Sequence, residues 1–298
     1  MTLPLNLAEF NWHSLKLISG ARNGGRLAEN LRILNSLTKL PVSYASVGKL
    51  SNSCRNLSNL EKLLAVSVKL GLTTMVRMQL DDLGNSIVVI SPHDDDGIIG
   101  CGGILHDLSQ KHARTYVIIM TDGSLGYSSI QQKSSITRVR RREAESAYRL
   151  VGAKPFFLGF PDMNLKAFSS WQTVNGKDGA YKKVLKILRE VRPRTVFIPN
   201  PIDWHPDHQA SYDVGLSISN LAATPAVADF GHPIDLRNIF FYKVWDKLAK
   251  VTHTHTLSRQ AQKTKARAIS EFESQRNILR NVTLEFGKER FQELRPVI

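Results

Sequence analysis

A short run of β-branched residues, Ile87-Val88-Val89-Ile90, constrains this chain most, because an acidic segment follows it directly. Such a run is typical of a strand that is buried on both faces of a parallel sheet. The next residues are Ser91-Pro92-His93-Asp94-Asp95-Asp96-Gly97. Three carboxylates and an imidazole at that place are costly unless they bind something. Because open α/β sheets bind ligands at the carboxyl ends of strands, we interpret this segment as an acidic metal-binding loop.

Strand and helix patterns alternate after residue 85. Apolar runs predict strands at 87–90, 115–120, 155–160, 195–198, 239–244 and 251–257. Amphipathic stretches predict helices at 99–112, 136–151, 180–191, 210–221 and 259–276. This order predicts an α/β domain over residues 86–298, with a mostly parallel sheet and helices on both faces.

Residues 1–85 form a predicted N-terminal extension with helix-like segments at 28–37 and 60–70. Two interpretations stay open: helices that pack on the main domain, or a basic helix that contacts a membrane surface or a partner. No apolar run reaches the roughly 18 residues of a transmembrane helix. The acidic Glu9 and the lack of a continuous apolar segment near the N-terminus argue against a secretory signal.

The 298 residues carry a formal net charge of +14, which favours anionic partners. The tightest basic cluster, Arg138–Arg142, predicts a substrate that carries phosphate or carboxylate, although a solvated helix face explains the cluster equally well. Because we find no signature of a nucleic-acid-binding module, nucleic acid is not the expected partner. Cys54 and Cys101 lie too far apart in sequence to form a zinc-type pair, which favours a reducing, cytoplasmic location.

Polar residues follow the predicted central strands. They are His93, Asp95, Asp96, Asp122, Asp162, His205, Asp207 and His208. In a parallel sheet these strand ends share one edge, so we expect the side chains to converge. Catalytic zinc takes three nitrogen or oxygen ligands from the protein. His93 and Asp96 would supply two, His205 and His208 one or two more, and Asp95 would be free to act as a base. Alternatively, His205-Pro206-Asp207-His208 only starts a helix, with Asp207 as its N-terminal cap.

The segment Pro92–Gly103 resembles the Pro-His-Pro-Asp-Asp-Glu…Gly-Cys-Gly-Gly signature of the PIG-L/LmbE-like de-N-acetylases. Further matches occur in family order at Thr121–Gly123, Arg140–Gly152, Leu158–Asp162, His205–His208 and Lys265…Ser274-Gln275. The resemblance implies a Rossmann-like fold and zinc-dependent removal of acetyl from an N-acetylglucosamine-type sugar or glycoconjugate, with Fe²⁺ as an alternative ion. The other readings are a zinc amidase on a non-sugar N-acyl substrate, and a catalytically silent binder of an anionic glycan or nucleic acid.

The resemblance also implies a role for each matching residue. It implies zinc ligands at His93, Asp96 and His208, a general base at Asp95, and sugar contacts at Arg140 and Asp162. It further implies that His205 stabilises the tetrahedral intermediate and helps to protonate the leaving amine, with Asp207 orienting its ring. Two positions depart from the signature: Asp94 replaces a proline and Gly97 a glutamate. Asp94 would strengthen metal binding or become a misplaced ligand. With Gly97, the chain lacks the glutamate that could form a hydrogen bond to a metal ligand.

Overall fold

The structure, a computed structural model, describes residues 75–294. Arg77–Ile298 form one compact unit, which begins before the predicted boundary at residue 86. Met78 and Leu83 explain the earlier start, because both are buried in the core of this unit. The helices predicted at 28–37 and 60–70, and with them the membrane-contact interpretation, lie outside the described residues. Among residues 75–294, no helix combines the length and the apolar character that a membrane span needs.

One eight-stranded sheet has the order β1-β7-β8-β6-β5-β2-β3-β4. The strands are β1 (Val76–Arg77), β2 (Ser86–Ser91), β3 (Arg114–Thr121), β4 (Ala153–Phe160), β5 (Thr195–Pro199), β6 (Asn238–Tyr242), β7 (His253–Thr256) and β8 (Lys288–Leu294). Strands β4, β3, β2, β5 and β6 run parallel to one another, as predicted. Strand β8 is antiparallel to both β6 and β7. Because β2 lies between β3 and β5, the strand order reverses there, and ligands bind at such a point in open α/β sheets.

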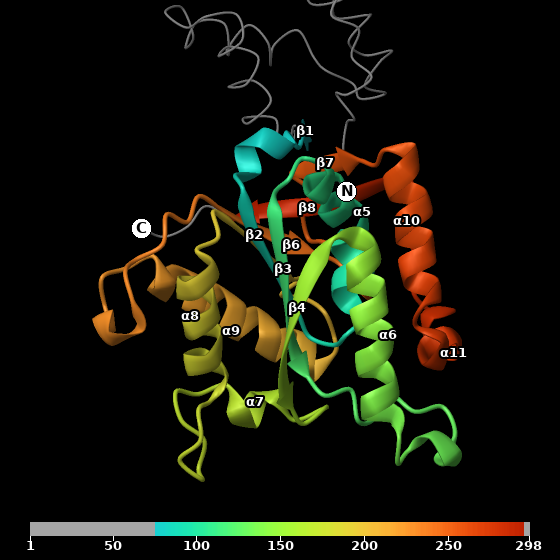
Figure 1. Cartoon of the computed structure of the whole chain (residues 1–298), viewed down its shortest axis with the longest axis horizontal. Coiled ribbons are helices and arrows are strands. Elements are labelled where there is room, and N and C mark those ends of the chain that lie inside the picture. Colours follow the sequence, from blue (N-terminus) through green and yellow to red (C-terminus); the bar gives the residue numbers. More distant parts are fainter. Residues whose placement is uncertain (1–74, 295–298) are drawn as a thin grey trace, which may run out of the picture. The chain divides into compact units, whose positions relative to one another are not determined.

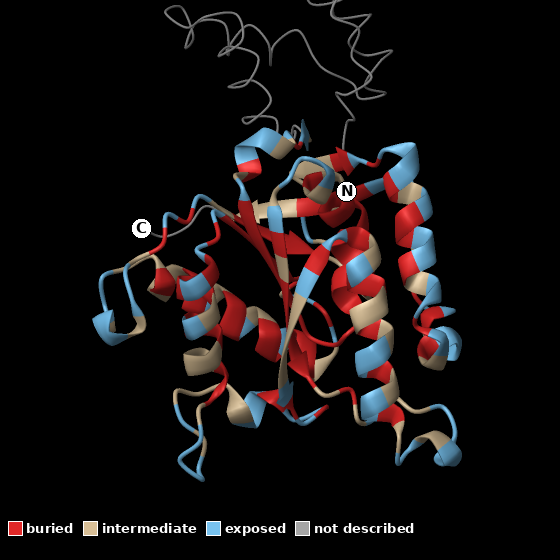
Figure 2. Ribbon diagram, in the orientation of Figure 1, coloured by how far each residue is buried: buried red, intermediate tan, exposed pale blue. Residues whose placement is uncertain are grey.

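Helices cover both faces of the sheet (Figure 1). They are α5 (Asp96–Gln110), α6 (Ile136–Val151), α7 (Leu165–Phe168), α8 (Ala180–Val191), α9 (Pro206–Ala222), α10 (Arg259–Ser270) and α11 (Arg276–Leu279). Alternation along β2 explains this arrangement. Ile87 and Val89 pack with α5 and α6, whereas Val88 and Ile90 pack with α8 and α9. Figure 2 shows the buried residues concentrated in the sheet and on the inward helix faces. The predicted α/β fold is confirmed.

Strand β8 is not predicted by the sequence patterns, because an acidic residue occupies one of its inward positions. Glu289 is 2% exposed and lies on the same face of the strand as the fully buried Phe291. The Glu289 carboxylate lies 2.6 Å from Nζ of the buried Lys265. It also accepts the backbone N–H groups of Gly103 and Ile104, each at 2.8 Å. This ion pair and these hydrogen bonds offset the cost of burying the carboxylate. Without them, a charged side chain at a core position would destabilise the fold.

Candidate active site

The loop after β2 folds back over the end of its own strand. The Ser91 hydroxyl donates to the His93 carbonyl at 2.5 Å and accepts the backbone N–H of Gly97 at 2.9 Å. At the first residue of α5, the Asp96 carboxylate accepts the backbone N–H of His93 at 2.9 Å. These short-range hydrogen bonds hold His93 and Asp96 in a fixed relation to each other.

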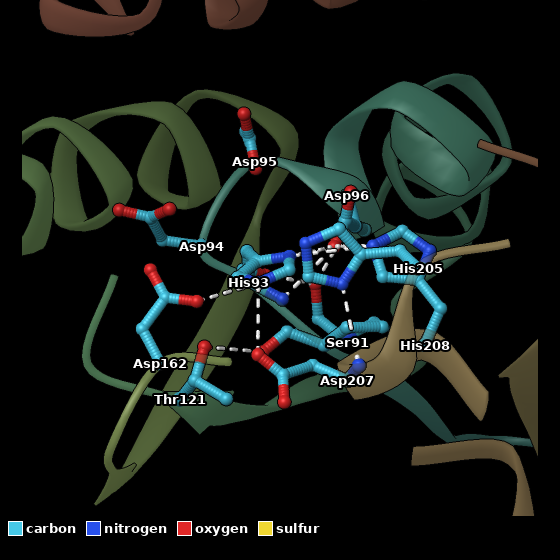
Figure 3. Close-up of polar contacts among 12 residues, drawn as sticks. Ser91, His93, Asp94, Asp95, Asp96, Thr121, Asp162, His205, Asp207 and His208 are labelled. Atoms are coloured by element: carbon cyan, nitrogen blue, oxygen red, sulfur yellow. Dashed lines mark hydrogen bonds and ion pairs between the residues drawn. The ribbon is translucent and has the colours of Figure 1, made fainter. Parts of the chain in front are cut away.

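Three side-chain atoms from the ends of β2 and β5 meet beside this loop (Figure 3). Asp96 Oδ2 lies 3.1 Å from His93 Nδ1 and 3.1 Å from His208 Nε2, and the two nitrogens lie 3.3 Å apart. Ligand atoms about 2.1 Å from a tetrahedral zinc ion are about 3.4 Å from one another. The three predicted ligands therefore form a set that fits one divalent ion.

A carboxylate lies behind each of the two imidazoles. His93 Nε2 is 3.2 Å from Asp162 Oδ1, and His208 Nδ1 is 3.0 Å from Asp203 Oδ2. When each ring donates its outer N–H to that carboxylate, the lone pair of the inner nitrogen faces Asp96. Asp203 is the residue of this site that the sequence analysis missed. Its signal was its position in the polar segment between β5 and His208.

The pKa values of the two imidazoles show how strongly this cluster attracts positive charge. Burial lowers the pKa of His208, but Asp96 and the hydrogen bond with Asp203 outweigh it and raise the pKa to about 9. Burial also lowers the pKa of His93, yet Asp162, Asp207 and Asp96 together raise it well above its usual value. Both shifts favour a proton on these rings when no cation is present, and a metal ion competes with that proton.

The described part of the chain contains two other sets of possible ligands that share His93. They are His93 with His205 and His208, and His93 with Asp162 and Asp207, and in each set the ligand atoms lie within 4.8 Å of one another. We place the candidate centre at the Asp96 set, because all three of its separations are 3.3 Å or less. Asp162 and Asp207 contact the opposite nitrogen of His93, Nε2.

His205 is the N-terminal cap of α9, the position that the helix-start interpretation gave to Asp207. The backbone N–H of Asp207 donates to His205 Nδ1 at 3.2 Å, so Nε2 carries the ring proton. Burial and the neighbouring His93 and His208 lower the pKa of His205 to about 4, and the ring is therefore neutral near pH 7. His205 thus offers an N–H donor and no readily released proton.

The Asp207 carboxylate, to which the resemblance gives the role of orienting the His205 ring, makes its hydrogen bonds to other groups. It accepts the backbone N–H groups of Met163 at 2.6 Å and Leu165 at 3.0 Å. Its Oδ2 also lies 3.5 Å from His93 Nε2. Asp207 therefore joins the loop after β4 to the start of α9 and supports His93 beside Asp162.

Asp94 and Asp95 stand apart from the contacts that join Asp96 to the imidazoles (Figure 3). Arg140 Nε donates to both oxygens of Asp94, at 2.8 and 2.9 Å, and its Nη2 lies 3.5 Å from Asp95 Oδ1. Asp94 is therefore an ion-pair partner and not a misplaced ligand. Burial raises the pKa of Asp95 to about 7; Arg140 opposes this rise, whereas Asp96 and Asp94 add to it.

The second departure from the signature, Gly97, has a steric cause. A Cβ atom at this position would lie 2.6 Å from Tyr148 Oη, closer than real Cβ atoms approach a neighbour. Tyr148 comes from α6 and is fully buried. In this chain the tyrosine occupies the space into which a side chain at position 97 would extend.

Residues 88–219 match a protein family described as PIG-L, GlcNAc-PI de-N-acetylase. These residues give the chain its similarity to the PIG-L family. It is 27% identical over 144 residues to diacetylchitobiose deacetylase of Thermococcus kodakarensis, a match covering 47% of this chain and 51% of that protein. It is 29% identical over 132 residues to 2'-N-acetylparomamine deacetylase of Streptomyces fradiae, covering 41% of this chain and 47% of that protein. The chain thus spans about half the length of these relatives.

A solved structure of N,N'-diacetylchitobiose deacetylase from Pyrococcus horikoshii is similar in fold to this chain. The TM-score is 0.61 at 22% sequence identity, and the match covers 81% of this chain and 95% of that one. This likeness supports the fold assignment.

A cavity of about 280 Å³ opens beside two of the three candidate ligands, His93 and Asp96. The two predicted sugar contacts, Arg140 and Asp162, both line it. The Arg140 guanidinium already donates hydrogen bonds to the Asp94 carboxylate. One oxygen of Asp162 contacts His93, and the other accepts the backbone N–H of Leu125 at 3.1 Å. These partners make Arg140 and Asp162 supports of the site at least as much as contacts for a substrate.

Proposed function

We propose that this domain hydrolyses the acetamide of an N-acetylated amino sugar and releases acetate, with a divalent ion held by His93, Asp96 and His208. The observation that carries the proposal is the triangle of ligand atoms, with sides of 3.1, 3.1 and 3.3 Å. Two imidazoles and one carboxylate suit zinc, and they also suit Fe²⁺. When bound there, zinc supplies Lewis acidity and makes water nucleophilic near neutral pH. The two deacetylase relatives support the choice of substrate.

Asp95 is the proposed general base. Its carboxylate lines the cavity beside Asp96, and its pKa of about 7 suits proton transfer near neutral pH. Asp95 accepts a proton from the attacking water as the new C–O bond forms. It returns that proton to the amine nitrogen as the C–N bond breaks, which gives acetic acid and the amine. The acid then loses its remaining proton to the amine or to solvent and leaves as acetate.

His205 is the proposed stabiliser of the negative charge that develops on the acetamide oxygen. Its Nε2–H is a donor because Nδ1 accepts the Asp207 backbone N–H. A pKa of about 4 leaves the ring neutral, so we assign the protonation of the leaving amine to Asp95 instead of His205.

Acetate release from a panel of N-acetyl amino sugars tests the proposal. We expect turnover by the purified protein, loss of turnover with a chelator, and recovery with added Zn²⁺ or Fe²⁺. Release of acetate only from non-sugar N-acetyl amides would instead identify an amidase. A protein that binds no metal and releases no acetate from any substrate would contradict the proposal.

A further inference from the structure

Eight of the residues that line the cavity are apolar and have no part in the proposed chemistry. We call them the apolar wall; they are Ile99, Leu125, Met163, Trp204, Trp245, Ile278, Leu279 and Val282. Leu125, Met163 and Trp204 are 51%, 50% and 61% exposed. Exposed apolar side chains grouped around a cavity mark a surface that a ligand covers.

Trp204 lies beside the reacting groups and is held in place by its neighbours. Its ring centroid is 5.3 Å from that of His205 and 6.0 Å from that of Trp245. The backbone N–H of Trp204 donates to Asp246 at 3.0 Å. The backbone N–H of Trp245 donates at 3.4 Å to Asp203 Oδ2, the same oxygen that contacts His208. The backbones that carry the two indoles are therefore anchored by hydrogen bonds, and that of Trp245 is anchored to Asp203, the partner of His208.

Met163 shows that the apolar wall is held in a specific conformation. Its backbone has a φ of 61°, a left-handed conformation that residues with a Cβ seldom adopt. The hydrogen bond from its N–H to the Asp207 carboxylate, at 2.6 Å, stabilises this conformation. Strained backbone tends to occur where a binding site requires it. Here it accompanies a half-exposed thioether side chain at the cavity.

The charges around the cavity argue against an anionic group at this wall. Arg140 is the single lysine or arginine among the described residues that line the cavity, and Asp94 neutralises it. The other arginines of the 138–142 cluster are exposed. Arg141, for example, lies 4.3 Å from the Phe157 ring centroid and pairs with Glu145 at 3.2 Å. Among residues 75–294, therefore, no unpaired lysine or arginine lines this cavity, although the whole sequence has a net charge of +14.

We infer that the apolar wall binds the group attached to the N-acetylated sugar, and that this group is uncharged with an apolar C–H face. A second sugar ring and a hydrocarbon chain both present such a face to an indole. Trp204 would then determine substrate specificity. This inference rests on the proposed function.

Four substrates test the inference: free N-acetylglucosamine, N,N'-diacetylchitobiose, octyl N-acetylglucosaminide and N-acetylglucosamine 1-phosphate. We expect kcat/KM for one or both uncharged conjugates to exceed that for the free sugar and the phosphate by about tenfold, the scale of one aromatic contact. The better of the two conjugates identifies the second sugar or the hydrocarbon as the natural group. Trp204→Ala should lower the ratio of conjugate to free-sugar kcat/KM by about tenfold, and Trp204→Phe should largely preserve it.

Ile202→Ala is the matched control, because Ile202 is 55% exposed on the same loop and is not one of the residues lining the cavity. It should leave all four rates unchanged. Calorimetric binding of the four compounds to zinc-loaded Asp95→Asn separates this inference from the proposed function. If no compound releases acetate from the wild-type protein, the proposed function fails, but tighter binding of the uncharged conjugates still supports the wall. Preference for the phosphate, or an equal effect of Trp204→Ala on all four compounds, would overturn the inference.

Discussion

Asp94 and Arg140 form a bidentate ion pair whose side chains are only 7% and 5% exposed. Burial lowers the pKa of the Arg140 guanidinium, but Asp94 and Asp95 raise it above its usual value, so the group stays charged. Asp94 stands at the position at which the signature of related sequences has proline. The ion pair with Arg140 also keeps the Asp94 carboxylate away from the candidate metal ligands.

The first prediction follows from the burial of this pair. Asp94→Ala leaves a buried guanidinium without its main partner, so we expect the free energy of unfolding to fall by about 3 to 5 kcal/mol. Urea denaturation measures the change. Glu145→Ala is the control, because it removes an exposed partner of Arg141 and should change stability by about 0.5 kcal/mol or less. Equal, small effects of both substitutions would show that Asp94 and Arg140 are not coupled.

The second prediction concerns the space at Gly97. Gly97→Ala places a methyl group 2.6 Å from Tyr148 Oη, and we expect it to destabilise the domain by about 1 to 3 kcal/mol. Adding Tyr148→Phe removes the clashing atom and should recover most of that loss. The thermal midpoints of the two single variants and the double variant measure the coupling. Purely additive effects would exclude the steric explanation.

Much of the domain could be predicted because its local patterns agree with its fold. The run Ile87–Ile90 gives β2, and the alternating strands and helices give the parallel core. Convergence of His93, Asp96 and His208 follows from parallel topology alone, since β2 and β5 are neighbours and end at the same edge.

The features that escaped prediction depend on long-range polar contacts. Strand β8 carries Glu289 inward only because Lys265 meets it there. The predicted helix 259–276 ends at Ser270, and further on Glu143 binds the backbone N–H and hydroxyl of Ser274 at 2.9 and 2.6 Å. No single-sequence pattern reports such partners.

The third prediction is that metal affinity rises with pH. The pKa of His208 is about 9, so below pH 9 an incoming ion must displace its proton. We expect the zinc association constant to rise by at least about tenfold per pH unit from pH 6 to 8, and to level off above the pKa. Competition with a chelator, corrected for the chelator's own protonation, measures it. Constant affinity across this range would mean that His208 is not a ligand.

The fourth prediction separates His205 from the ligands. His205→Ala should keep its metal, because the three ligand atoms come from other residues. Its kcat should fall by about 10² to 10³, the effect of losing one oxyanion donor. Elemental analysis and acetate release measure the two quantities. Loss of metal in this variant would instead favour the set of His93, His205 and His208.

The adjacent residues Asp95 and Asp96 give the most direct test, because two identical side chains have different proposed roles, a general base and a metal ligand. The measurement is metal content together with the rate of acetate release in Asp95→Asn and Asp96→Ala. Asp95→Asn should retain its metal and lose about 100-fold or more in rate, the scale of general-base catalysis. Asp96→Ala should lose both, since Arg140 holds Asp94 and prevents it from replacing the missing ligand. Metal loss in Asp95→Asn with metal retained in Asp96→Ala would contradict the account.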